Sequence, residues 1–445
     1  MQNQLSASSA RAALRLALPG MLAMLASSLC ALLDALLLGR NDASAAAAVS
    51  ACLPVLTVIQ TIGFTLGTGA GSHISRSLGS GDSRSAAQAA QAAFWLALML
   101  SVPLCAVGLL LRDPLVSLLG AGEAAAPAGE YALYVLLSGP LLCMNLVLSS
   151  LLRGLGRMKA YAAAFTLGAA LGAALQFLLI PQQGIHGSGV AMLAREALTL
   201  LILLFCARAA SPRVLPRVRG LRLRPAVFAD IMRSGLPVLV RQGLTSAAAA
   251  VSSRAASGFG QAALAGTGLA ARAIMLISSA VIGFSQGFQP VIGYAAGRDD
   301  MENARKSGRV LLKYVIVSLA LVGAALYAFA PGLLVLFQPE AEVLRIAAKS
   351  LRAQSVVLFA QGAVIAMTML TQALGMTVRG SIVAASRQGF VLIPLLLILP
   401  RAFGLSGLIL CQSASDVLSL ILCLILTRPA LTGSSCARCG CSDAR

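Results

Sequence analysis

Three carboxylates lie deep inside long apolar stretches of the chain, namely Asp34, Glu196 and Asp416. If these stretches are helices that span a membrane, each charge near the bilayer centre costs about 3 kcal/mol or more unless it faces a cavity or a partner. Carboxylates in such places can exchange a proton or bind a cation. All three are therefore candidate sites for a coupling ion or a substrate.

The motifs of ATP hydrolysis and of metal catalysis are missing from the sequence. It has no glycine-rich phosphate loop, and its two histidines, His73 and His186, cannot form a His-Glu-x-x-His zinc site. Cys436, Cys439 and Cys441 form Cys-x-x-Cys-x-Cys, but they supply fewer than four metal ligands, which favours a loose tail over a metal site. We expect no enzyme and no cofactor, and transport that draws on an ion gradient or on the substrate's own gradient.

The composition is that of an integral membrane protein. Apolar residues make up 58% of the 445 residues and charged residues 11%, against about 45–50% and about 25% in soluble domains. A window of about 19 residues finds twelve stretches long enough to span a bilayer, which predicts an all-α fold of twelve transmembrane helices. They are Ala12–Leu38, Ala45–Gly71, Ala86–Leu111, Ala128–Ser150, Ala160–Ile180, Gly187–Ala207, Gly235–Ser257, Ala262–Val291, Arg309–Ala330, Leu351–Thr371, Gly380–Pro400 and Leu405–Thr427.

The two halves of the chain resemble each other. Leu18-Pro19 recurs as Leu236-Pro237, and Gly63-Phe64 recurs as Gly283-Phe284. Because each half holds an even number of spans, both halves enter the membrane from the same side and form parallel six-helix repeats, with substrate expected between them. The predicted division is an N-lobe (1–207), a basic linker (208–234), a C-lobe (235–427) and a tail (428–445).

Basic residues predict how the chain is oriented. It has 34 Lys and Arg against 15 Asp and Glu, a net charge of +19. With both termini in the cytoplasm, most basic residues fall in cytoplasmic segments, many of them in the linker. The outside segments hold only Arg40, Arg112, Arg345, Lys349, Arg352 and Arg401. The positive-inside rule therefore predicts cytoplasmic termini and accounts for the charge without nucleic-acid binding.

Several segments resemble one known family. They are Asp34 with Leu38-Gly39-Arg40, Leu66-Gly67 with Ile74–Gly79, Gly283–Tyr294, and Ser386–Gly389 with Ile393-Pro394. In these segments, and over nearly its whole length, the chain resembles the multidrug and toxic compound extrusion (MATE) family, most closely its bacterial cation-coupled exporters. The resemblance implies two six-helix lobes in a bacterial inner membrane. They would export lipophilic and cationic organic compounds in exchange for H⁺ or Na⁺ by alternating access, and we expect a monomer.

The resemblance and the spacing give each deep charge a role to test. Asp34 matches the acidic position of the family's first helix, which implies a coupling or substrate role, although a side chain that reaches the membrane interface is the alternative. Arg387 and Asp416 lie at depths that let them meet, either as a structural ion pair or as a protonatable site in the C-lobe. For Glu196, next to Arg195, the sequence is equally compatible with a packing role and with a role in transport.

The eighth span carries two amides beside a proline. Gln286 and Gln289 precede Pro290, which predicts that they line a cavity, with packing as the alternative. Gly283 and Gly287 in the same span are four residues apart and predict a close helix contact.

The chain departs from the family in the fifth span. Many members carry an Asn and, four residues later, an Asp that face the N-lobe cavity, whereas this chain has Gly172 and Gln176. Neither residue can titrate, so Asp34 would be the only evident acid of an N-lobe site. We therefore predict coupling to H⁺ rather than Na⁺.

An alternative function within the same superfamily is a flippase for lipid-linked precursors. Such proteins carry basic residues that face a central cavity, and Arg241, Arg254 and Arg272 lie within predicted spans of the C-lobe. A membrane-embedded enzyme is the more remote alternative, because the sequence offers no convincing pair of nucleophile and base.

Overall fold

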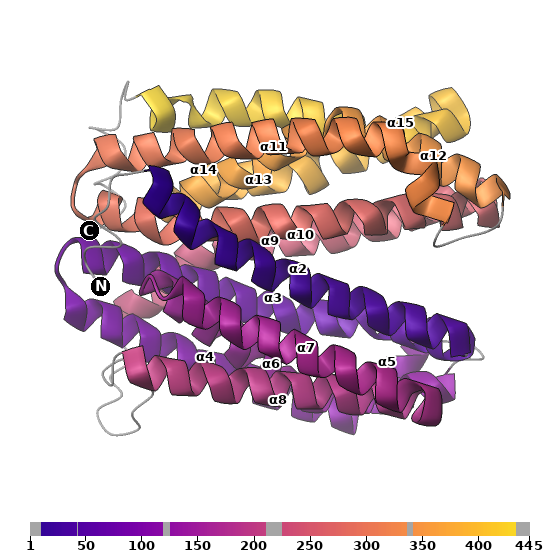
Figure 1. The fold of residues 1–445 in the computed structure, drawn as a ribbon, viewed down its shortest axis with the longest axis horizontal. Helices are drawn as coiled ribbons and strands as arrows, with labels where there is room; N and C mark the ends of the chain where they lie inside the picture. Colours follow the sequence, from indigo (N-terminus) through magenta and orange to yellow (C-terminus); the bar gives the residue numbers. More distant parts are fainter. Residues whose placement is uncertain (1–9, 42, 119–124, 211–224, 336–340, 433–445) are drawn as a thin grey trace.

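The computed structural model describes residues 10–41, 43–118, 125–210, 225–335 and 341–432, and nearly all of these residues are helical. Among them, nine helices are long and apolar enough to cross a membrane, or ten when one bent pair counts as a single span. The helices run along the long axis of the molecule and form two bundles (Figure 1). The predicted all-α membrane fold is confirmed.

The first bundle contains the helices of the N-terminal half. They are α2 (Ala10–Asn41), α3 (Ala43–Gly79), α4 (Ser83–Leu110), α5 (Arg112–Leu118), α6 (Ala125–Gly154), α7 (Met158–Gln183) and α8 (Ile185–Ala210). Apart from the short α5, each of them is a candidate membrane span.

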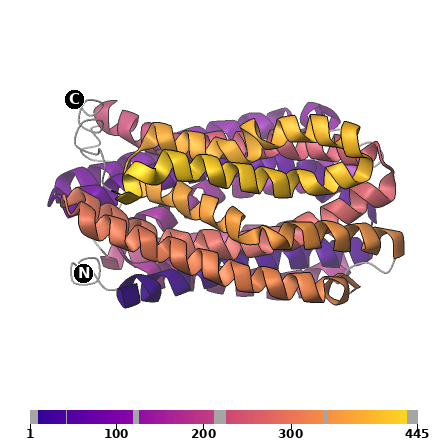
Figure 2. The ribbon, with the colours of Figure 1, turned by 90° about the horizontal axis from the view of Figure 1, so that it is seen from above.

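The second bundle contains the helices of the C-terminal half, which Figure 2 shows from above in colours from pink through orange to yellow. They are α9 (Pro225–Ser257), α10 (Gln261–Gly297), α11 (Met301–Val335), α12 (Ala341–Val356), α13 (Leu358–Ala373), α14 (Thr377–Ala385), the π-helix η2 (Ser386–Phe390) and α15 (Leu392–Thr432).

The span count differs from twelve for reasons that lie in the second bundle. Helix α9 has 33 residues, enough to cross, but its arginines make it too polar to qualify by composition. The 52-residue stretch Thr377–Arg428 counts once, although it contains a non-helical residue, Gly404, and is long enough for two crossings of about 20 residues each.

The predicted tenth span is a bent pair rather than a straight helix. Helices α12 and α13 meet at an angle of 57°. Helix α12 carries Arg345, Lys349 and Arg352 and is much more polar than α13, so only α13 suits the hydrocarbon core.

The predicted linker, residues 208–234, overlaps the end of α8 and the start of α9. Helix α9 begins at Pro225, because proline suits the first position of a helix. Residues 211–224 of the linker and the three tail cysteines, Cys436, Cys439 and Cys441, lie outside the described residues.

The internal repeat is visible in the turns. Residues with positive φ occur at equivalent places in the two halves. The pairs are Gly81 (83°) with Asp299 (59°), Gly156 (73°) with Gly375 (76°), and Gly184 (53°) with Gly404 (59°). The first turn of each half is followed by an aspartate that caps the next helix: Asp82 accepts from the Ser85 amide and Asp300 from the Asn303 amide. The Asn303 side chain also donates to Asp300, and these hydrogen bonds lower the pKa of that carboxyl.

The bundles are joined where α2 and α9 begin and where α3 and α10 end, here called the closed end. A Cβ at Gly20 of α2 would lie 2.6 Å from the Gly283 carbonyl oxygen of α10, so the two backbones touch. The contact surface between the two bundles is here called the seam. On its other side, Arg76 of α3 donates to Ser234 Oγ of α9 at 3.2 Å. Thus α2 packs on α10 and α3 packs on α9, as expected of parallel repeats related by an axis between them.

The close contact at Gly283 predicts a stability effect. In Gly283→Ala the new Cβ would press on the Gly20 backbone and lie 2.9 Å from Met24 Cβ, and overpacking of this kind costs about 1–3 kcal/mol. We expect a lower melting temperature in detergent. Gly268→Ala, on the same helix, is the matched control, because its Cβ would meet nothing within 4 Å. Equal melting temperatures for the two variants would contradict this account of the seam.

Candidate functional site

Asp34 lies inside the first bundle, where α2, α7 and α8 meet. Its side chain is 9% exposed. Ser188 Oγ of α8 donates to Asp34 Oδ1 at 2.7 Å, and Gln176 Nε2 of α7 donates to the same oxygen at 3.2 Å. The carboxylate therefore points into the bundle, toward α7 and α8.

The tight turn between α7 and α8 places Ser188 beside Gln176. Gly184 adopts a φ of 53°, a conformation that favours glycine, and turns the chain back on itself. A Cβ at Gly187 would lie 2.5 Å from the Leu179 backbone, so the two helices touch at this turn. The first turn of α8 thus packs against the last turn of α7.

Glu196 belongs to the same bundle and has two strong partners. Arg195 Nη2 donates to Glu196 Oε1 at 2.8 Å, and Asn145 Nδ2 of α6 donates to Glu196 Oε2 at 2.8 Å. Arg195 Nη1 also donates to Cys30 Sγ at 3.8 Å, and the Cys30 thiol donates to Gln176 Oε1 at 3.5 Å.

These contacts form one continuous chain of polar groups, here called the acidic cluster. It consists of Asp34, Ser188, Gln176, Cys30, Arg195, Glu196 and Asn145. Sequence reasoning missed Ser188, Cys30 and Asn145. Their signal was weak but present, since each is a polar or polarisable residue within an apolar span, and Cys30 precedes Asp34 by one helical turn.

Gly172 explains how Arg195 enters the acidic cluster. A Cβ at Gly172 would lie 2.9 Å from Arg195 Cδ and 3.1 Å from Cys30 Sγ. The missing side chain therefore leaves the space that the arginine stem fills. Of the two positions that are polar in many family members, position 172 thus borders the positive charge of Arg195. The other position holds Gln176, which is a neutral donor to Asp34.

The second bundle holds the ion pair that the spacing allowed. Arg387 Nε of η2 donates to Asp416 Oδ1 of α15 at 2.6 Å, and Gln412 Nε2 donates to the same oxygen at 3.2 Å. Ser415 Oγ donates to the Arg387 carbonyl at 2.6 Å. The predicted meeting of Arg387 and Asp416 is confirmed. The arginine lies on a π-helical turn, a distortion that is frequent at functional sites.

The three arginines that suggested a flippase differ in their surroundings. Arg241 is partly buried in α9, and its Nε has no hydrogen-bond partner among the described residues. Arg254 and Arg272 are exposed. The three side chains therefore do not share one environment.

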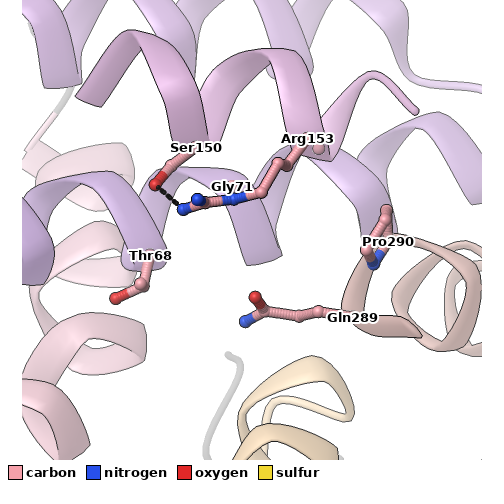
Figure 3. A pocket seen from close by; sticks show the side chains of 7 residues that line it. Thr68, Gly71, Ser150, Arg153, Gln289 and Pro290 are labelled. Atoms are coloured by element: carbon pink, nitrogen blue, oxygen red, sulfur yellow. Dashed lines mark hydrogen bonds between the residues drawn. The ribbon is translucent and has the colours of Figure 1, made fainter. Parts of the chain in front are cut away.

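Gln286 and Gln289 lie at the seam between the bundles rather than beside a carboxylate. Gln289 Nε2 donates to Ser72 Oγ of α3 at 3.1 Å. Gln286 is 2% exposed, and its Oε1 has no hydrogen-bond partner within the part of the chain that the structure describes. Gln289 also lines a small pocket of the seam, where its amide faces Thr68 and Arg153 (Figure 3).

The family model described as MatE matches this chain twice, at residues 19–178 and 237–398. The chain belongs to the MATE family. The two matches start at Pro19 and Pro237, the prolines that revealed the repeat. The fold and the family agree that this MATE protein is a membrane transporter and not an enzyme.

Relatives of this MATE protein include multidrug export proteins. It is 25% identical over 434 residues to the multidrug export protein MepA of Staphylococcus aureus, with 95% of each chain covered. It is 24% identical over 409 residues to MepA of Staphylococcus haemolyticus, covering 90% of this chain and 89% of that one.

Solved structures of transporters have the same fold. The outward-facing conformation of a multidrug resistance MATE transporter matches with a TM-score of 0.91 and 25% identity, covering 97% of this chain and 98% of that one. A mutant form of the Vibrio cholerae MATE transporter VcmN matches with a TM-score of 0.89 and 22% identity, covering 98% of this chain and 99% of that one.

The buried pair in the second bundle predicts an asymmetric mutational response. Arg387→Met leaves Asp416 buried without its counter-charge, which costs about 3–5 kcal/mol, whereas Arg387→Met combined with Asp416→Leu removes both charges and should recover most of that loss. Thermal unfolding in detergent measures both. A single variant as stable as the double variant would contradict the prediction.

The double variant also separates the two interpretations of this pair. If it is stable and still exports, the pair is structural. If it is stable but inactive, the pair takes part in transport.

Proposed function

We propose that this MATE protein is a secondary active exporter that removes lipophilic and cationic organic compounds in exchange for H⁺. It would act as a monomer in a bacterial inner membrane, by alternating access. The observation that carries the proposal is the buried Asp34 carboxylate, held by Ser188 and Gln176 inside the first bundle. The naming of its relatives as multidrug export proteins supports the choice of substrates.

The partners of Asp34 favour a proton over a sodium ion. Hard cations such as Na⁺ prefer a shell of oxygen acceptors, and here both neighbours turn a donor toward the carboxylate. Arg195 adds a fixed positive charge to the same cluster through the space beside Gly172. That charge is paired with Glu196, so Asp34 is the carboxylate of the cluster that lacks a counter-charge, and protonation neutralises it without requiring further ligands.

The proposed orientation has both termini and the 208–234 segment in the cytoplasm. The closed end, where α2 begins, then faces the cytoplasm. The contact of the two bundles at that end and the similarity to an outward-facing relative support an outward-facing state.

Cysteine labelling tests this orientation. A single cysteine at Arg157, which is exposed beside the start of α7, should resist an impermeant thiol reagent added to intact cells and react after lysis. A cysteine at Arg112, at the other end of the bundle, should react without lysis. The reverse pattern would invert the topology.

Asp34→Asn should reduce dye efflux at least tenfold while expression stays normal, because the amide keeps the shape of the side chain but cannot exchange a proton. Asp113→Asn is the matched control, since Asp113 is exposed and its ion pair among the described residues is with the neighbouring Arg112. Full efflux by a well-expressed Asp34→Asn variant would rule out the coupling role.

In proteoliposomes, an imposed pH gradient should drive substrate movement without Na⁺, and a Na⁺ gradient alone should not. Liposomes that contain the Asp34→Asn protein give the background rate. Transport that required Na⁺ and ignored the pH gradient would overturn the choice of ion and leave the exporter function standing.

A further inference from the structure

We propose that the seam between the two bundles holds a small inorganic anion, such as chloride, on the guanidinium of Arg153. The site is a pocket at the closed end that both bundles line, and Figure 3 shows it with Arg153 pointing into it. Its lining residues are Thr68 and Gly71 of α3, Ser150, Arg153 and Gly154 of α6, and Gln289 and Pro290 of α10.

The charge of Arg153 is buried without a counter-charge. Its side chain is 5% exposed. Among the described residues, no carboxylate lies within 4.0 Å of it, and its partners are Ser150 Oγ at 2.6 Å and the ring of Tyr161, whose centre lies 4.8 Å from Cζ. A desolvated guanidinium of this kind needs more compensation than one hydroxyl and one aromatic ring provide.

The end of helix α6 does not supply that compensation. Its last carbonyls are already occupied, because the Gly156 amide donates to the Arg153 carbonyl at 2.7 Å and the Arg157 amide donates to the Leu152 carbonyl at 2.8 Å. Helical side chains also lean toward the N-terminus of their helix. The guanidinium accordingly extends back to Ser150, one turn earlier, and into the pocket.

A second arginine makes the seam more positive. Arg76 crosses it and donates to Ser234 Oγ at 3.2 Å and to the Gln372 carbonyl at 3.4 Å, with no carboxylate within 4.0 Å among the described residues. Arg76 does not line the pocket itself, and Asp230 of α9 offsets part of its charge, so Arg153 remains the main positive group of the site. The amide of Gln289 offers a further donor, since only one of its two N–H groups is needed to reach Ser72.

The volume of the pocket limits the size of the anion that can bind. It has room for about one water-sized particle, which excludes a lipid headgroup or an organic anion. Because the walls come from both bundles, a bound anion holds the closed end together. Chloride would therefore favour the state in which this end is closed, independently of the ion that Asp34 exchanges.

The test is the melting temperature of the purified full-length protein in detergent, with chloride or bromide replacing gluconate at constant ionic strength. We expect the halide to raise the midpoint of the wild-type protein by about 2 °C or more in a saturable manner, since a ligand of the folded state stabilises it. Arg153→Gln should abolish the shift. Arg157→Gln, which removes an exposed charge four residues away, should keep it.

Two further measurements cover the case in which Arg153→Gln does not fold. Ser150→Ala should raise the half-saturating halide concentration, and bromide crystals should give an anomalous peak beside Arg153. A wild-type protein indifferent to halide, a shift retained in Arg153→Gln, or an ordered bromide elsewhere with none in this pocket would overturn the proposal.

Discussion

Charge buried in an apolar bundle has to be compensated by neighbouring side chains, and the arrangement of this protein depends on that constraint. Only 11% of the residues are charged, yet three carboxylates lie in the helix interiors. Each is held by donors from a different part of the chain: Asp34 by Ser188, Glu196 by Asn145, and Asp416 by Arg387. Because no water reaches the hydrocarbon core, these contacts fix the rotation and depth of the helices that supply them.

Contact between the bundles follows a different rule. In lipid, apolar surface alone does not drive helices together, so close backbone approach at small residues matters more. Gly20 against Gly283 joins α2 to α10, and Gly69 against Ile231 joins α3 to α9. These two contacts involve equivalent helices of the repeat. The same small-residue packing therefore holds both sides of the seam.

The symmetric fold carries asymmetric chemistry. The acidic cluster of the first bundle contains two carboxylates and one arginine. The second bundle contains Asp416 with Arg387, and Arg241, whose Nε has no partner among the residues that the structure describes. This difference agrees with the proposal that the first bundle exchanges the coupling ion. Repeats related by an axis can diverge in this way because each bundle forms its own interior contacts.

The sequence alone determined the membrane class, the repeat, the family and the three deep carboxylates, because apolar composition and span length are local properties that the bilayer imposes directly. It also placed Arg387 and Asp416 at matching depths, since rise per residue is constant in a helix. Tertiary structure decided the rest. The bend between α12 and α13, the donors to Asp34 and the entry of Arg195 beside Gly172 depend on how helices rotate against one another, and an apolar pattern of residues does not encode that rotation.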